Sequence, residues 1–164
     1  TRLLTWLAVP AIVALDQATK FWVMGRYYLW EADPIVGNLL RFTRVHNTGA
    51  AFGVAQDYPG FFRIVTGIAI AVIAVHKLMT VHRHLLYQGA LALVLAGAIG
   101  NMIDRVLYNH VIDFIDVGFG EDWRWPAFNV ADSAITIGVG LLLVESFRRP
   151  AEPAVAAVAA DAEA

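Results

Sequence analysis

Four stretches of mostly apolar residues constrain this chain more than any other feature. They cover about residues 3–25, 61–80, 85–105 and 126–147. A helix needs roughly 20 such residues to cross the hydrocarbon core of a bilayer. Only 16% of the chain is charged, whereas a soluble domain is about one quarter charged. We therefore expect an all-α membrane protein with four transmembrane helices.

The connection between the first two predicted helices, about residues 26–60, is long enough to fold. Gly37 and Asn38 separate two short apolar runs in PIVGNLLRFTRV, and this pattern is typical of a β-hairpin. The other two connections are shorter. The second is basic, and the third is rich in acids and tryptophan.

Lysine and arginine residues near helix ends orient membrane proteins, because they favour the cytoplasmic side. Here the two sides carry equal numbers. One set lies in bare short segments and the other in connections that we expect to be folded, so we place both termini in the cytoplasm. The first set is Arg2, Lys77, Arg83, Arg148 and Arg149, and the second is Arg26, Arg41, Arg44, Arg63 and Arg124.

In this topology almost every unusual polar residue falls on the outer side of the membrane. An ionisable group in a span costs about 2.5–3.5 kcal/mol at the helix centre and usually has a function. We therefore expect one polar pocket near the outer surface and an inner half that is bare of such groups. The candidates are Asp16, Lys20, Asn47, Asn101, Asp104, Arg105, Asp113, Asp116, Asn129, Asp132 and Ser133.

Several of these charged residues also have a purely structural interpretation. Asp16 and Lys20 are four residues apart on one helix face, so the pair could simply neutralise itself during insertion. Asp104 and Arg105 could end a helix at the interface. Asp132 lies near the start of a helix, where an acid is favourable.

Asp113 is the acid that a structural role explains least well. Its neighbours Ile112, Phe114 and Ile115 indicate an apolar setting, and Asp116 is its obvious competitor. Two carboxylates in a partly dry pocket tend to share a proton. One can then take a proton from water while the other donates to a carbonyl oxygen, which hydrolyses a peptide bond. The sequence does not by itself show which two acids meet.

Other chemistries have less support. The chain has no cysteine, and its five histidines form no metal-ligand spacing, so we expect no metal or other cofactor. A net charge of −2 provides no basic field for nucleic acid. A dyad of Ser133 and Lys20 is an alternative. A small transporter or proton relay also uses buried charges, but it needs them in both halves of the membrane. A third alternative is an inactive lipid- or peptide-binding scaffold.

Five motifs occur together: LDQATK, VHNTGAAFG, GAIGNMIDRV, VIDFIDV and FNVADSAI. In order and spacing, over about residues 10–145, they resemble the lipoprotein signal peptidases, or signal peptidase II. The resemblance implies a four-helix aspartyl endopeptidase of the bacterial inner membrane. Its substrates would be prolipoproteins that it cuts just before a lipobox cysteine carrying diacylglycerol. It also implies inhibition by globomycin, contact with membrane lipid, and an active site near the outer face.

By this resemblance, Asp113 and Asp132 match the catalytic dyad. Residues 1–149 would form a single monomeric integral-membrane peptidase domain. For residues 150–164 the Ala-rich composition, not the resemblance, indicates a disordered tail. The first connection would form a small extracytoplasmic β-cradle or loop subdomain, with NTGAAFG as a lid. The remaining motif residues would shape the pocket and hold substrate; they are Asp16, Lys20, Asn47, Gly97, Asn101, Asp104, Arg105 and Asn129.

Overall fold

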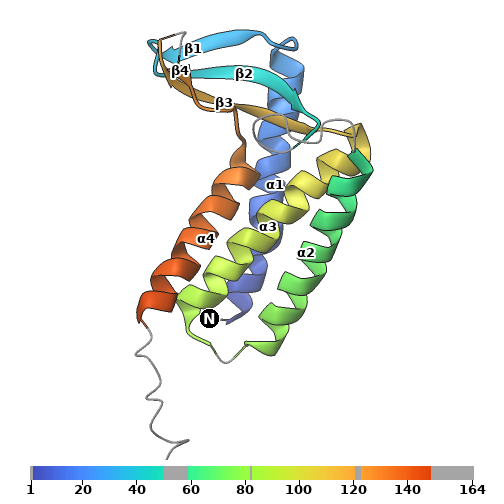
Figure 1. The fold of residues 1–164 in the computed structure, drawn as a ribbon, viewed down its shortest axis with the longest axis vertical. Coiled ribbons are helices and arrows are strands. Elements are labelled where there is room, and N and C mark those ends of the chain that lie inside the picture. Colours follow the sequence, from blue (N-terminus) through green and yellow to red (C-terminus); the bar gives the residue numbers. More distant parts are fainter. Residues whose placement is uncertain (1, 50–58, 82, 121–122, 149–164) are drawn as a thin grey trace, which may run out of the picture.

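A computed structural model of the chain describes residues 2–49, 59–81, 83–120 and 123–148. It consists of four long helices with a small sheet at one end (Figure 1). The tail at 150–164 and most of the predicted lid lie outside the described residues. The helices are α1 (Arg2–Arg26), α2 (Pro59–Met79), α3 (Leu85–Tyr108) and α4 (Val130–Arg148).

Each of these four helices contains a segment long and apolar enough to cross a membrane. Their outward faces expose large apolar side chains, among them Phe21 at 73% and Phe147 at 86%. Such faces suit lipid rather than water. The chain is therefore a multi-pass membrane protein, as predicted. The segments are Leu3–Arg26, Gly60–Met79, Leu85–Tyr108 and Val130–Phe147.

The central helix is α3, which packs against α1, α2 and α4. Two glycines set how closely its neighbours approach. A Cβ built on Gly97 would lie 2.3 Å from the carbonyl oxygen of Ala131 in α4. A Cβ on Gly100 would lie 2.6 Å from Oδ2 of Asp16 in α1. Small residues at such crossings allow helix backbones to come together in lipid.

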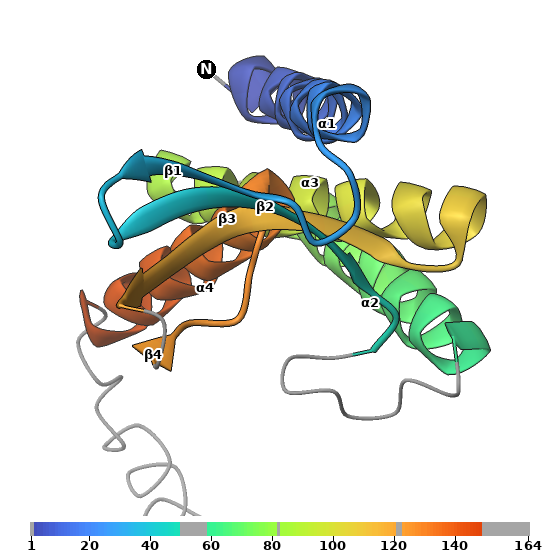
Figure 2. The same ribbon diagram turned by 90° about the horizontal axis from the view of Figure 1, so that it is seen from above.

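The sheet has four antiparallel strands in the order β1-β2-β3-β4 and lies across the end of the bundle (Figure 2). The predicted hairpin at Gly37 and Asn38 is confirmed, with Gly37 in the left-handed region at φ +48. The long strand β3 was not predicted. The strands are β1 (Ala32–Val36), β2 (Leu40–Asn47), β3 (Val111–Phe119) and β4 (Trp123–Arg124).

The start of α4 differs from the predicted boundary near residue 126. Phe128 is held in extended conformation, because its N–H donates to the carbonyl of Ile115 at 3.0 Å and its own carbonyl accepts the Ile115 N–H at 2.8 Å. Asn129 then caps the helix: its Oδ1 accepts the Asp132 N–H at 2.9 Å, and Asp132 Oδ2 accepts the Asn129 N–H at 3.2 Å. This reciprocal capping box fixes Asp132 in the first turn.

Candidate active site

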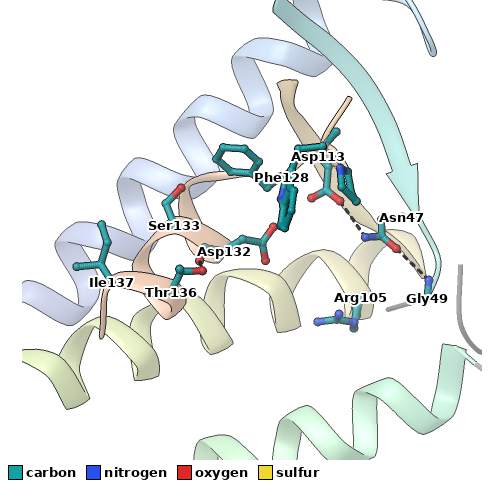
Figure 3. A pocket seen from close by; sticks show the side chains of 12 residues that line it. Asn47, Gly49, Arg105, Asp113, Phe128, Asp132, Ser133, Thr136 and Ile137 are labelled. Carbon is teal, nitrogen blue, oxygen red and sulfur yellow. Dashed lines mark hydrogen bonds between the residues drawn. The ribbon is translucent and has the colours of Figure 1, made fainter. Parts of the chain in front are cut away.

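Asp113 and Asp132 face one cavity of about 580 Å³ on the sheet side of the bundle (Figure 3). Asp113 comes from β3 and Asp132 from the first turn of α4, so two segments of the chain supply one acid each. The segment 125–128 forms part of the cavity wall. The cavity is lined by Asn47, Gly49, Arg105, Asp113, Trp125, Pro126, Ala127, Phe128, Asp132, Ser133, Thr136 and Ile137.

Asn129 connects the two acids. Its side-chain Nδ2 donates to Asp113 Oδ1 at 2.7 Å, and its backbone N–H donates to Asp132. The outer oxygens are held by two further amides. Asn47 Nδ2 donates to Asp113 Oδ2 at 2.9 Å, and Asn101 Nδ2 donates to Asp132 Oδ1 at 2.7 Å. Each of the four carboxylate oxygens thus accepts a hydrogen bond from an amide.

The environment of Asp113 favours its protonated form. Its side chain is 2% exposed. Burial, followed by repulsion from Asp132, raises the pKa of Asp113 to about 7. Hydrogen bonds from Asn47 and Asn129, and the charge of Lys20, act in the opposite direction. A large fraction of Asp113 is therefore protonated at neutral pH, beside a second acid in the same cavity.

Arg105 borders the same cavity from α3. Its NH1 lies 3.5 Å from the carbonyl oxygen of Asn101, and its guanidinium lies 5.9 Å from the centre of the Phe62 ring. Figure 3 shows its planar group beside the open space below the two acids. A guanidinium has five N–H donors, so this position suits the binding of substrate carbonyl groups.

Asp16, Lys20 and Asp104 form a buried ion cluster behind the acids. The Lys20 ammonium lies 2.9 Å from Asp16 Oδ2 and 2.8 Å from Asp104 Oδ2. Each of the three side chains is about 1% exposed, and none lines the cavity. Asp16 accepts the backbone N–H of Ala131 at 2.8 Å, and Asp104 accepts that of Ile112 at 3.1 Å. The cluster therefore anchors the starts of α4 and β3.

Gln17 was not predicted, although it belongs to the LDQATK motif. Its Nε2 lies 3.1 Å from Asp16 Oδ2, 3.0 Å from Asp104 Oδ1 and 3.2 Å from the carbonyl oxygen of Gly100. It bridges the two carboxylates of the ion cluster. Its position next to Asp16 in sequence was the only available signal.

Asp116, the competitor of Asp113, has a different environment. Arg41 Nε and Arg124 Nε lie 2.5 and 2.6 Å from its two oxygens. Burial alone would raise the pKa of Asp116, but the two arginines together lower it below its ordinary value. Asp116 does not line the cavity. It clamps β2, β3 and β4 together, and the lowered pKa favours its ionised form.

Ser133 lines the cavity, but its contacts do not match a serine–lysine dyad. Its hydroxyl donates to the carbonyl of Asn129 at 2.9 Å. The Lys20 ammonium instead lies against Asp16, Asp104 and Asn101. Across residues 2–49, 59–81, 83–120 and 123–148, no three His, Asp or Glu side chains are grouped as a metal site would need.

The expectation of a bare inner half is wrong. Lys77 is fully buried near the end of α2 that lies away from the sheet. Its ammonium donates to Thr5 Oγ1 at 3.2 Å and to two oxygens of Gln88 at 2.8 and 3.1 Å, and it lies 4.9 Å from the centre of the Trp6 ring. By sequence, Lys77 is among the basic residues near helix ends, whereas in the structure α1, α2 and α3 enclose its side chain.

The chain is similar to known proteins in both sequence and fold. The lipoprotein signal peptidase of Janthinobacterium sp. (strain Marseille) is 43% identical over 153 residues, which cover 91% of this chain and 92% of that relative. The enzyme of that name from Shouchella clausii is 45% identical over 141 residues, covering 86% and 91%. A solved structure described as a bacterial membrane enzyme superposes with a TM-score of 0.75 at 34% identity, covering 92% of this chain and 93% of the other.

A second solved structure with the same description gives a TM-score of 0.76 at 34% identity, covering 89% and 94% of the two chains. The family profile for Signal peptidase (SPase) II matches residues 8–148. This range contains both acids, the whole sheet and all of the helices except the first residues of α1. The chain therefore belongs to the signal peptidase II family and is a membrane-embedded peptidase.

Proposed function

We propose that this protein is an aspartyl endopeptidase that removes signal peptides from prolipoproteins carrying diacylglycerol on the lipobox cysteine. The bond cut lies just before that cysteine. One observation carries the proposal: two acids from β3 and α4 share a cavity, and burial raises the pKa of Asp113 to about 7. The names of the relatives support the substrate class.

In the proposed mechanism, Asp132 is the general base and Asp113 the general acid. Asp132 takes a proton from a water molecule, whose oxygen attacks the carbonyl carbon of the scissile bond. Asp113 gives its proton to the carbonyl oxygen. When the intermediate collapses, the C–N bond breaks, Asp132 passes its proton to the departing nitrogen, and Asp113 recovers a proton from the new carboxyl group. Arg105 holds the substrate backbone during these steps.

The cavity lies at the sheet end of the bundle, and its apolar wall suits a lipid-linked substrate. Ile137 and Phe128 line it together with the two acids. We place this end at the outer face of the bacterial inner membrane, with both termini in the cytoplasm. Residues 1–149 would act as one monomeric domain, because one chain supplies both acids. A globomycin-type inhibitor would occupy the same cavity.

The proposal is tested by incubating the purified protein in detergent with a prolipoprotein whose lipobox cysteine carries diacylglycerol. Mass spectrometry should find a product that begins with the lipidated cysteine. The same precursor without the lipid is the control and should be cut poorly. If folded protein leaves the lipidated precursor intact in several lipids, the proposed function is wrong.

Asp116→Asn should lower activity only mildly, by less than about tenfold, because the clamp and not the chemistry is altered. One arginine can still donate to the amide oxygen, whereas the amide NH2 replaces the oxygen that the other arginine contacts, and both ion pairs are lost. The measurement is kcat and KM, and the matched control is Asp33→Asn. This variant removes another carboxylate of the sheet, one that accepts the Tyr27 hydroxyl at 3.0 Å. A loss as large as that of Asp113→Asn would contradict the assignment of the acids.

The pH dependence of kcat/KM should show a fall in cleavage as the pH rises through about 7. Below the raised pKa of Asp113, about 7, its carboxyl group holds the proton that the carbonyl oxygen needs, and above that pKa the proton is lost. We call this fall the alkaline limb of the pH profile. Asn47→Ala should move the alkaline limb to higher pH, because the Asn47 hydrogen bond lowers the pKa of Asp113. A limb at the ordinary aspartate pKa of about 4, or a shift to lower pH, would argue against Asp113 as the acid.

A further inference from the structure

The side-chain amide of Asn101 lies between a cation and a carboxylate. Its Oδ1 accepts from Lys20 Nζ at 3.1 Å and from Asn129 Nδ2 at 3.2 Å, and its Nδ2 donates to Asp132 Oδ1 at 2.7 Å. An amide can also be placed the other way round, with oxygen and nitrogen exchanged. The reversed amide would turn an oxygen toward Asp132, where it would repel the carboxylate instead of binding it.

Lys20 favours the first orientation, as does the neighbouring Asn129 amide. An ammonium group has three donors and no acceptor, so only the oxygen of Asn101 can face it. The three donors of Lys20 match three acceptors, one each on Asp16, Asp104 and Asn101. We propose that Lys20 is a positioning residue, whose ammonium fixes the Asn101 amide so that its Nδ2 is aimed at Asp132. This inference rests on the proposed function of the two acids.

Lys20 cannot play this part by touching substrate. Its side chain is 1% exposed and does not line the cavity. Its charge also reaches the acids directly, because it lowers the pKa of Asp113. Loss of the cation would therefore disturb both the aim of Asn101 and the proton affinity of the acids. The charged and titratable groups that interact with Lys20 are Asp16 on α1, Asp104 on α3, Asp113 on β3 and Asp132 on α4. Arg105 on α3 interacts with three of the same acids, Asp104, Asp113 and Asp132.

The fold supplies a matched control for Lys20. Lys77 is equally buried, and its ammonium also has three acceptor oxygens, but these belong to Thr5 and Gln88 at the other end of the bundle. Lys77→Met removes a buried cation without altering Asn101. A purely structural role of Lys20 would make the two methionine variants behave alike. A positioning role separates them in the pH profile.

The experiment measures kcat, KM and the pH profile of Lys20→Met, Lys77→Met and wild type on the lipidated precursor. Lys20→Met should lower kcat by on the order of 10- to 100-fold, the effect of a misplaced catalytic group. Its alkaline limb should move to higher pH, because losing a nearby cation raises the pKa of Asp113. Lys77→Met should keep the wild-type limb. Wild-type kcat and pH profile in folded Lys20→Met, or equal shifts in both variants, would overturn the inference.

A double-mutant cycle asks whether Lys20 acts through Asn101. Asn101→Leu removes the amide, so adding Lys20→Met to it should lower kcat by much less than it does in wild type. Fully additive losses would overturn the inference. If Lys20→Met does not fold, the double variant Lys20→Met/Asp104→Asn replaces it, because it removes one positive and one negative charge together. An undiminished kcat in this double variant would also overturn the inference. If Asp132→Asn stays active, the proposed function itself fails, which is a different result.

Discussion

Asp113→Asn and Asp132→Asn are each expected to abolish cleavage while the protein stays folded. An asparagine in place of Asp132 cannot take a proton from water, and one in place of Asp113 cannot give a proton to the carbonyl oxygen. General acid–base groups contribute on the order of 10²–10⁴-fold. Because the two acids act as a unit, the double variant should be little slower than either single one. Initial rates on the lipidated precursor measure all three.

Ser133→Ala is the control for this prediction. Ser133 lines the same cavity one residue from Asp132, and its hydroxyl is already donated to the Asn129 carbonyl. Its loss should leave kcat within a few-fold of wild type. An inactive Ser133→Ala beside active aspartate variants would show that a serine nucleophile performs the reaction. Near-identical thermal unfolding of all the variants would show that the differences are chemical.

Gly97→Ala should have the largest effect on stability. The new Cβ would lie 2.3 Å from the Ala131 carbonyl oxygen and 2.7 Å from Cγ1 of Ile135. Backbone cannot move aside as the end of a flexible side chain can, so α4 must shift away from α3. Overpacking of this kind costs about 1–3 kcal/mol and occasionally more. Since α4 carries Asp132, cleavage should fall together with the melting temperature measured in detergent.

Gly89→Ala is the matched control on the same helix. A Cβ at Gly89 meets no atom within 4 Å, and alanine is the better helix former. Its melting temperature and activity should equal or exceed those of wild type. If the two variants were equally stable, the close crossing of α3 and α4 would not be what Gly97 provides.

Much of the fold could be predicted from short segments of the sequence. The four spans follow from apolar runs long enough to cross the hydrocarbon core of a bilayer. The β1–β2 hairpin follows from a glycine that adopts positive φ. The capping bonds between Asn129 and Asp132 also join residues only three positions apart. Each of these features rests on contacts made within a short segment.

The missed features depend on distant partners. The first four residues of β3 are all at most 4% exposed, so the strand lacks the alternation that reveals a half-buried one. Its register places Asp116 opposite Arg41 and Asp113 opposite Val45. In this register Asp116 pairs with an arginine, whereas Asp113 lines the cavity. Nothing local distinguishes the two, because both lie in the short run VIDFIDV.

The pairing of Phe128 with Ile115 has a consequence for the membrane insertion and folding of the enzyme. It joins the strand that carries Asp113 to the segment that leads into the helix of Asp132. A nascent chain whose last span has not yet entered the bilayer holds one acid without the other. If both acids are needed for cleavage, as proposed, activity would arise only once the last span is inserted, and incompletely inserted copies would not cut neighbouring membrane proteins.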